Sequence, residues 1–174
     1  MKPSNERALG GPPTAFLLAQ VGAHAASQFA GRLAALELGP PHAGIMRILG
    51  SRPAITQQSL AGTLGMQPSR LVALVDELET RGLVERRANP DDRRSHALHL
   101  TGKGRATLEA IGRVSREHQQ ALLAALNEDE QRQLGILLRR IADQQGLAPG
   151  VHPGYARMGG GGRGVCDPPG NAAR

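Results

Sequence analysis

The sequence predicts a mainly helical protein with one short β-hairpin. Its 174 residues suffice for one ordinary domain with a substantial core. Aromatic residues make up only 2% of the chain, so Leu, Ala, Val, Ile and Met must fill that core. Ala and Leu favour helices. Apolar residues recur at helical spacing through most of the chain, and only two short segments look like strands.

The first two helices are predicted from their flanking residues. Thr14 can cap a long helix over residues 14–38, which "GPP" ends. A second, short helix fits "HAGIMRILG", bounded by the prolines and by Gly50. Residues 1–13, rich in Pro and Gly, are expected to be flexible because they cannot bury enough apolar surface.

The next two helices form a helix-turn-helix pattern. Thr56 can cap "QQSLAGTL", in which Leu60, Ala61 and Leu64 fall on one face, and Gly65 ends this helix. Pro68 then stands at a first helical position before "SRLVALVDELETRG". The link "LGMQP" is a short turn with a glycine between two amphipathic helices, which is typical of a helix-turn-helix. Two packed helices in any bundle can also look this way.

A β-hairpin follows these helices. The segments "LVERR" and "ALHL" flank a polar loop with "NPDD", which predicts two antiparallel strands. Leu98 and Leu100 would face one side of the second strand, and His99 the other. Helix, turn, helix and hairpin in this order predict a winged helix with a two-stranded wing, over about residues 40–101.

Two long helices are predicted after the hairpin. Thr101 can cap the first, which continues toward Leu126, and Asn127 with Glu130 resembles a capping box that starts the second. A winged helix does not need these helices, or the long first one, for its own core. They predict a dimerisation region over about residues 14–38 and 102–147 of a single domain, residues 14–147. The last 27 residues hold eight Gly and four Pro, so residues 148–174 are expected to be a disordered tail.

The charge balance favours a polyanionic partner. Lys and Arg outnumber Asp and Glu by 21 to 15, giving a net charge of +6, and 19 of the cations are Arg. Arg is the better donor to phosphates and base edges. A basic excess alone also fits an anionic membrane surface, or an ordinary protein from a GC-rich genome.

Several other classes are disfavoured. The single Cys166 cannot form an intramolecular disulfide, so we expect a cytoplasmic protein. No segment approaches the roughly 18 apolar residues of a membrane span. The six histidines lack metal-site spacing, and His96 and His99 lack a third ligand. We therefore expect neither an enzyme nor a bound cofactor or metal.

The start of the second helix-turn-helix helix carries the candidate DNA contacts. In this motif the second helix enters the major groove, and residues near its N-terminus reach bases and phosphates. Here those residues are Gln67, Pro68, Ser69 and Arg70. Gln67 can cap the helix or contact DNA, Ser69 can bind a phosphate or base, and Arg70 can reach a guanine edge. A solvated helix face is the alternative for Arg70.

The hairpin tip carries the second set of candidates. In a wing, Arg93 and Arg94 would extend toward the adjacent minor groove, where negative potential is concentrated. Asp92 lies two residues from Arg94 and could hold its guanidinium in a bidentate pair. The alternative is a surface loop whose charges neutralise each other.

The span "QQSLAGTLGMQPSRLVALVDELETRGLVERRANPDDRRSHALHLTGKGR" resembles the MarR (multiple antibiotic resistance regulator) family of winged-helix transcription factors. The most specific match is "RGLVERRANPDDRRSHALHLTGKG", which keeps the family's wing, its D-x-R element and the L-T-x-x-G start of the next helix. The resemblance implies a homodimeric repressor that binds a pseudo-palindromic operator and is released by a small-molecule ligand. Arg94 matches the family's minor-groove arginine and Asp92 its orienting acid, while Pro68, Ser69 and Arg70 match the start of its recognition helix.

Two features set this chain apart from many members. Val72 and Ala73 stand where polar or basic residues often add DNA contacts, so we expect thin base readout. Cys166 lies outside the helices where thiol-sensing members keep their cysteine, which argues against redox sensing. The alternative functions are a winged-helix module that binds protein or RNA and a non-specific DNA-binding protein without an effector. Single-stranded RNA would need exposed aromatic residues, so duplex DNA is the favoured partner.

Overall fold

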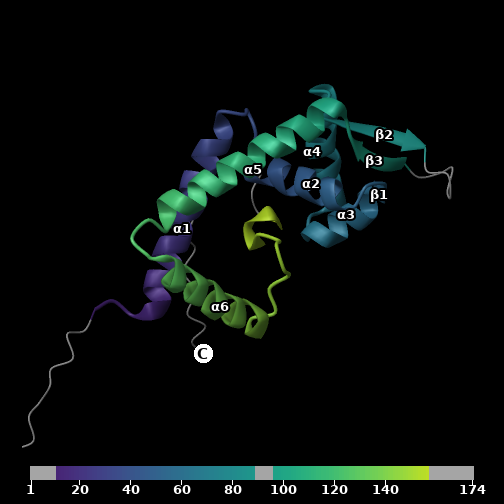
Figure 1. Cartoon of the computed structure of the whole chain (residues 1–174). Helices are drawn as coiled ribbons and strands as arrows, with labels where there is room; N and C mark the ends of the chain where they lie inside the picture. The colour runs from purple at the N-terminus through teal and green to yellow at the C-terminus, as the bar shows by residue number, and fades with distance from the viewer. Residues whose placement is uncertain (1–10, 89–95, 157–174) are drawn as a thin grey trace, which may run out of the picture.

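A computed structural model of the chain describes residues 11–88 and 96–156. Six α-helices, three strands and one short 3-10 helix follow one another in these ranges (Figure 1). Their bounds are α1 Thr14–Ala34, α2 Pro40–Ser51, β1 Ile55–Thr56, α3 Gln57–Leu64, α4 Pro68–Thr80, β2 Val84–Ala88, β3 His96–Leu100, α5 Gly102–Leu122, α6 Glu128–Gln144 and η1 Pro153–Ala156. The predicted mainly helical winged-helix fold is confirmed.

Helix α5 connects the winged helix to the helices at the other end of the molecule. At one of its ends, α2, α3, α4 and the sheet gather into the winged helix (Figure 1). Helix α1 packs along α5, and α6 follows the other end of α5 and runs back below it (Figure 1). The core lies among the winged-helix elements and the adjoining ends of α1 and α5. Its most fully buried side chains are Leu33, Ile45, Met46, Leu60, Leu64, Leu71, Val75, Leu78, Leu83, Val84 and Leu98.

The polar caps predicted at three helix starts are confirmed. The side chains of Thr56, Thr101 and Asn127 each accept a hydrogen bond from a backbone N–H in the first turn. Asn127 and Glu130 form the predicted capping box in both directions. Gly65 ends α3 in the left-handed conformation, with φ of 61°. These helix boundaries are predictable from the sequence because each cap involves only residues within one turn of the helix end.

Other predicted boundaries were wrong. Thr14 is the first residue of α1, not its cap, because Pro13 occupies the cap position and makes no side-chain bond. The helix ends at Ala34, before Leu38, since Glu37 adopts a positive φ of 55°. Arg81, at the end of α4, donates hydrogen bonds to the carbonyls of Leu36 and Glu37 and stabilises this early turn.

Two further helix boundaries also differ from the prediction. Helix α2 begins at Pro40, earlier than predicted, because prolines fit the first turn of a helix and the Gly39 N–H is capped by Nδ1 of His42. Helix α5 ends at Leu122 rather than near Leu126. Leu126 instead lies in the turn to α6, where its N–H bonds the Leu123 carbonyl.

The sheet has one strand more than the predicted two-stranded wing. Strands β2 and β3 pair antiparallel, with Val84 opposite Leu100 and Ala88 opposite His96. The two-residue strand β1 adds to the other side of β3, with Ile55 opposite Leu98, giving the order β1-β3-β2. Leu98 is fully buried on the inner face of the sheet, as predicted from its alternation with His99.

The structure describes residues 148–156, which were predicted to belong to a disordered tail. Residues 148–156, here called the C-terminal strap, run from the end of α6 back to α2, with η1 at the far end (Figure 1). Tyr155 in the strap is only 8% exposed and belongs to the hydrophobic core cluster. The Gly and Pro content of this segment predicted too little apolar surface for docking. The buried ring of Tyr155 supplies that surface.

Candidate DNA-binding interface

The turn between α3 and α4 is fixed by the backbone. Gly65 and Met66 donate hydrogen bonds to the carbonyls of Gly62 and Ala61, at 3.3 and 3.0 Å, and so close the last turn of α3. The Met66 side chain is buried in the core and so anchors the turn to it. Helix α4 starts two residues later, so its first residues are held in a fixed direction relative to α3.

The first residues of α4 face solvent. Gln67, Pro68 and Ser69 are exposed, and Gln67 makes no side-chain cap, so the predicted capping alternative was wrong. Pro68 has no N–H, and the N–H groups of Ser69 and Arg70 have no partner within the helix. This helix start therefore offers backbone donors and positive dipole to an anion such as a phosphate.

Arg70 has a different environment from its neighbours. Its side chain is half-buried, and its Nη2 atom is shielded from solvent without a hydrogen-bond partner among the described residues. An unpaired guanidinium nitrogen is unfavourable when it is buried. The Nη2 atom of Arg70 therefore does not face solvent, and a contact of this nitrogen with a guanine edge requires a change of rotamer.

Two apolar residues follow the polar start of α4 on its exposed face. Leu71, Val75 and Leu78 point into the core, whereas Val72 and Ala73 are exposed, Val72 at 41%. These two side chains carry no donor or acceptor and can make only apolar contacts, for example with a thymine methyl group. Base-specific hydrogen bonding by this helix is limited to its first residues.

The predicted residues of the wing tip cannot be placed. Ala88 at the end of β2 pairs with His96 at the start of β3, so the described parts of the two strands end side by side. Asp92, Arg93 and Arg94 lie between them, outside the described residues. Their roles in minor-groove binding stay predictions.

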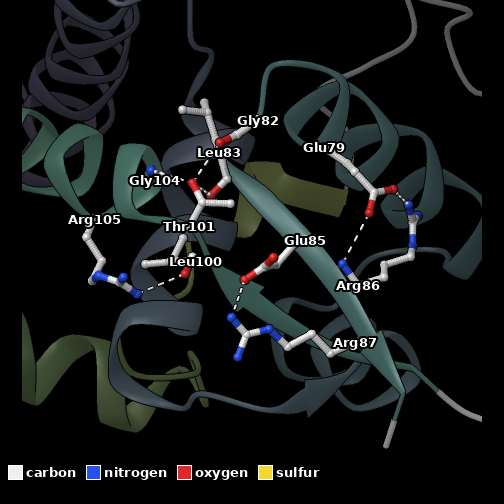
Figure 2. A network of polar contacts seen from close by, with 10 residues as sticks. All are labelled: Glu79, Gly82, Leu83, Glu85, Arg86, Arg87, Leu100, Thr101, Gly104 and Arg105. Carbon is white, nitrogen blue, oxygen red and sulfur yellow. Dashed lines mark hydrogen bonds and ion pairs between the residues drawn. The ribbon is translucent and has the colours of Figure 1, made fainter.

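Arg86, which the sequence analysis treated only as part of a strand, connects the wing to α4. Its guanidinium pairs with Asp76 at 2.5 Å and also with Glu79, and its backbone N–H donates to Glu79 at 3.1 Å (Figure 2 draws the Glu79 pair). Its side chain is 20% exposed, compared with 61% for Arg87, which pairs with Glu85 on the same strand. Arg86 thus ties the wing to α4 and offsets part of the negative charge of Asp76 and Glu79.

The base of the wing is fastened to the start of α5. Thr101 donates its hydroxyl hydrogen to the Gly82 carbonyl at 2.7 Å and accepts from the Gly104 N–H at 2.9 Å (Figure 2). The backbone of Gly104 lies so close to this site that an added Cβ would stand 1.9 Å from the Leu83 carbonyl oxygen. The T-x-x-G sequence is explained by this contact, because Thr supplies the cap and Gly permits the approach.

Two helices at the far end of the molecule expose apolar side chains. In α1 these are Phe16, Leu17, Leu18 and Val21, between 42% and 58% exposed. In α6 and just beyond it they are Ile136, Leu137, Leu138, Ile141 and Leu147, between 38% and 47% exposed. Clusters of exposed apolar residues of this kind mark interaction surfaces.

A cavity of about 720 Å³ lies between α2, α5, α6 and the C-terminal strap. Phe29, Ile111 and Val151 contribute apolar surface. Arg47 and Arg139 contribute positive charge, and Asp143 contributes one negative charge. The size suits a small organic molecule. Nearby on α1 and α5, burial and the Arg32 charge lower the pKa of His118, whose ring lies 5.4 Å from that of Phe29.

Residues 11–88 and 96–156 contain neither a membrane-spanning helix nor a cluster of metal ligands. None of the helices there combines the length and the apolar run needed to cross a bilayer. Within the same residues, no group of three or more His, Cys, Asp or Glu side chains is placed to hold a metal ion.

Comparison with known proteins identifies the family. Residues 38–96, from the start of α2 to the first residue of β3, match the sequence model of the MarR family. The transcriptional repressor CouR, solved bound to a 23-mer DNA duplex, is 34% identical, with a TM-score of 0.67 over 75% of this chain and 92% of CouR. The chain belongs to the MarR family. This is a family of winged helix-turn-helix transcriptional regulators.

Other MarR-like proteins agree with this assignment. The regulator BilQ of Clostridium symbiosum is 31% identical over 93 residues, which are 53% of this chain and 65% of BilQ. The chain therefore spans slightly less than two thirds of that curated relative. The MarR-family protein Rv2887 of Mycobacterium tuberculosis, solved with p-aminosalicylic acid, is 28% identical, with a TM-score of 0.61 over 75% of this chain and 98% of that one.

Proposed function

We propose that this MarR-family protein is a cytoplasmic, homodimeric repressor that binds a pseudo-palindromic operator in duplex DNA. The observation that carries the proposal is the relationship between α4 and the wing. The exposed start of α4 belongs to the same helix that Arg86 of β2 fastens to the described part of the wing. A helix for the major groove and a wing for the adjacent minor groove need such a fixed relation.

The roles of individual residues follow from this arrangement. Gln67, Pro68 and Ser69 would contact phosphate and base edges at the start of α4, and Arg70 would join them after a rotamer change. Arg94 would enter the minor groove with Asp92 orienting it, and Arg93 would add a phosphate contact. CouR, solved on a DNA duplex, supports this use of the fold.

The exposed apolar residues support a dimer. Helices α1 and α6 carry nine large apolar side chains that are 38% or more exposed, counting Leu147 just after α6. A second copy of the chain would cover both faces through a two-fold interface. The proposed single domain of residues 14–147 then consists of a winged helix, residues 40–101, carried by dimerisation helices over residues 14–38 and 102–147.

The cavity between α2, α5 and α6 is the proposed effector site. It combines apolar walls with Arg47 and Arg139, which suits an aromatic molecule with an anionic group. Rv2887, solved with p-aminosalicylic acid, supports this ligand class. Because the cavity touches both α2 and α6, a ligand there could change how the winged helix sits on the dimerisation helices.

The proposed function is tested by selecting bound fragments from genomic DNA and footprinting them. Two protected half-sites about one helical turn apart are expected for a symmetric dimer. Affinity should fall steeply with salt, because each neutralised phosphate releases counterions. A module that binds protein would show no salt-dependent duplex binding. A non-specific binder without an effector would protect no defined site.

A further inference from the structure

The C-terminal strap is attached to α2 at two points. At the first, the Tyr155 ring lies against Gly44, where an added Cβ would stand 2.8 Å from Cε2 and 2.9 Å from Cζ of the ring. At the second, the Arg47 guanidinium donates a hydrogen bond to the Gly150 carbonyl. Gly44 and Arg47 are three residues apart, so both attachments lie on one side of α2.

Both attachments depend on the absence of a side chain. No larger residue could replace Gly44 without displacing the tyrosine ring. Gly150 has a φ of 70°, and a Cβ there would lie 2.9 Å from Nη1 of Arg47. The strap therefore fits α2 closely at each point, and its burial of Tyr155 raises the pKa of the phenol against a smaller opposing effect of Arg47.

The strap also closes one side of the proposed effector cavity. Its residues Gly150, Val151, His152 and Tyr155 line the cavity together with residues of α2, α5 and α6. Arg47 is a shared partner, because it lines the same cavity and is already bonded to a strap carbonyl. A carboxylate is a stronger acceptor for a guanidinium than a neutral carbonyl.

We propose that the C-terminal strap is a latch on the effector cavity, held by Tyr155 at Gly44 and by Gly150 at Arg47, and that an anionic aromatic ligand releases it by taking Arg47. In the closed state, the strap joins the end of α6 to α2. In the open state, the ligand anion replaces the Gly150 carbonyl and Tyr155 leaves its place beside Gly44. The ligand half of this inference rests on the proposed effector role of the cavity.

The docking of the strap is measured first, in the full-length chain without ligand. Tyr155 is the only tyrosine and there is no tryptophan, so intrinsic fluorescence reports the strap alone. Acrylamide should quench Tyr155 poorly in the parent and several-fold more strongly in Gly44→Ala, whose methyl group displaces the ring. Gly62→Ala is the matched control, since this helical glycine has nothing within 4 Å of an added Cβ. Equal quenching in the parent and Gly44→Ala overturns the latch.

Release by an anion is then measured with benzoate, and with benzamide as its neutral counterpart. Benzoate should speed hydrogen exchange of the Val151 and Tyr155 amides, which bond the Ala148 and His152 carbonyls, whereas benzamide should not. If the strap is closed in about nine of ten molecules, Gly44→Ala should bind benzoate about tenfold more tightly, because no closed state competes.

The outcomes separate the two proposals. Equal or weaker benzoate binding by Gly44→Ala overturns release by competition, since the strap would then be a wall that the ligand needs. If Tyr155 is shielded in the parent and freed in Gly44→Ala, yet neither protein binds benzoate, the strap docks but the proposed effector cavity fails. Faster exchange with benzamide as well as benzoate overturns the role given to Arg47.

Discussion

Arg86 of β2 and Asp76 of α4 form an ion pair at 2.5 Å that joins the wing to the helix proposed to read the major groove. Glu79, one turn further along α4, holds the same guanidinium. Two carboxylates on one cation leave little rotational freedom, and the backbone N–H of Arg86 adds a third bond. One side chain that need not touch DNA therefore helps to fix the wing relative to α4.

Replacing Arg86 with Gln should weaken both stability and DNA binding. We expect a loss of about 1 to 2 kcal/mol in the free energy of unfolding, because hydrogen bonds to charged groups disappear while the acids stay partly solvated. Operator affinity should also fall, since two uncompensated acids would then lie near the phosphates. Urea denaturation and fluorescence anisotropy measure the two effects. Arg87→Gln is the control, and an equal loss of stability in both variants would contradict the clamp.

Gly104 should not tolerate a methyl group. Gly104→Ala places a Cβ 1.9 Å from the Leu83 carbonyl oxygen, so the start of α5 must move away from the wing. We expect a cost of about 3 kcal/mol in the free energy of unfolding, as for other overpacked sites. Gly102→Ala is the matched control in the same turn, because nothing lies within 4 Å of its added Cβ. Similar melting temperatures for the two variants would show that the close approach is not required.

Local signals made much of the fold predictable. Thr56, Thr101 and Asn127 cap their helices through bonds to residues three positions away, so the sequence alone contains both partners. The order helix-turn-helix and hairpin was likewise predictable from turn residues and periodicity. The end of α1 was predicted wrongly because it does not depend on local residues alone. Arg81, which follows the distant helix α4, stabilises it.

The parts that escaped prediction depend on contacts between distant segments. The two-residue strand β1 is too short for alternation and exists only through its pairing with β3. Arg86 meets its acids only once β2 lies beside α4. Arg47 and Gly150 are 103 residues apart, so nothing local in a Gly-rich and Pro-rich tail indicates that it docks. The exposed start of α4 was predictable because the turn and Pro68 define it locally, and its role in DNA binding stays a prediction.

Arg94→Ala should reduce DNA affinity without reducing stability. If the side chain enters the minor groove, its loss should cost about 1 to 3 kcal/mol of binding free energy, with the melting temperature unchanged. Asp92→Asn should show a smaller loss, because it would only orient the arginine. Anisotropy titrations at several salt concentrations measure both. Parent-like affinity in Arg94→Ala would remove the wing from the proposed interface.

Leu137→Glu should convert the proposed dimer into a monomer. Leu137 on α6 is 42% exposed in the single chain, and a dimer interface would bury it, where an unpaired carboxylate is unfavourable. Sedimentation velocity should give twice the mass of one chain for the parent and a single-chain mass for the variant. Val72→Glu, at an equally exposed site on α4, should stay dimeric. A parent protein that is already monomeric would contradict the two-fold assembly.

Stability should fall in mild acid because of His118. Burial and the nearby Arg32 lower the pKa of this imidazole below its ordinary 6.5, so the folded state binds a proton less readily than the unfolded chain. The stabilising effect of the neutral ring is complete above the unfolded pKa and is lost as the pH falls toward the folded pKa. Urea denaturation between about pH 8 and pH 5 measures this slope. His118→Gln should flatten it, while His24→Gln, on the exposed face of α1, should leave it unchanged. If the free energy of unfolding of His118→Gln varied with pH as in the parent, groups other than His118 would cause the acid sensitivity.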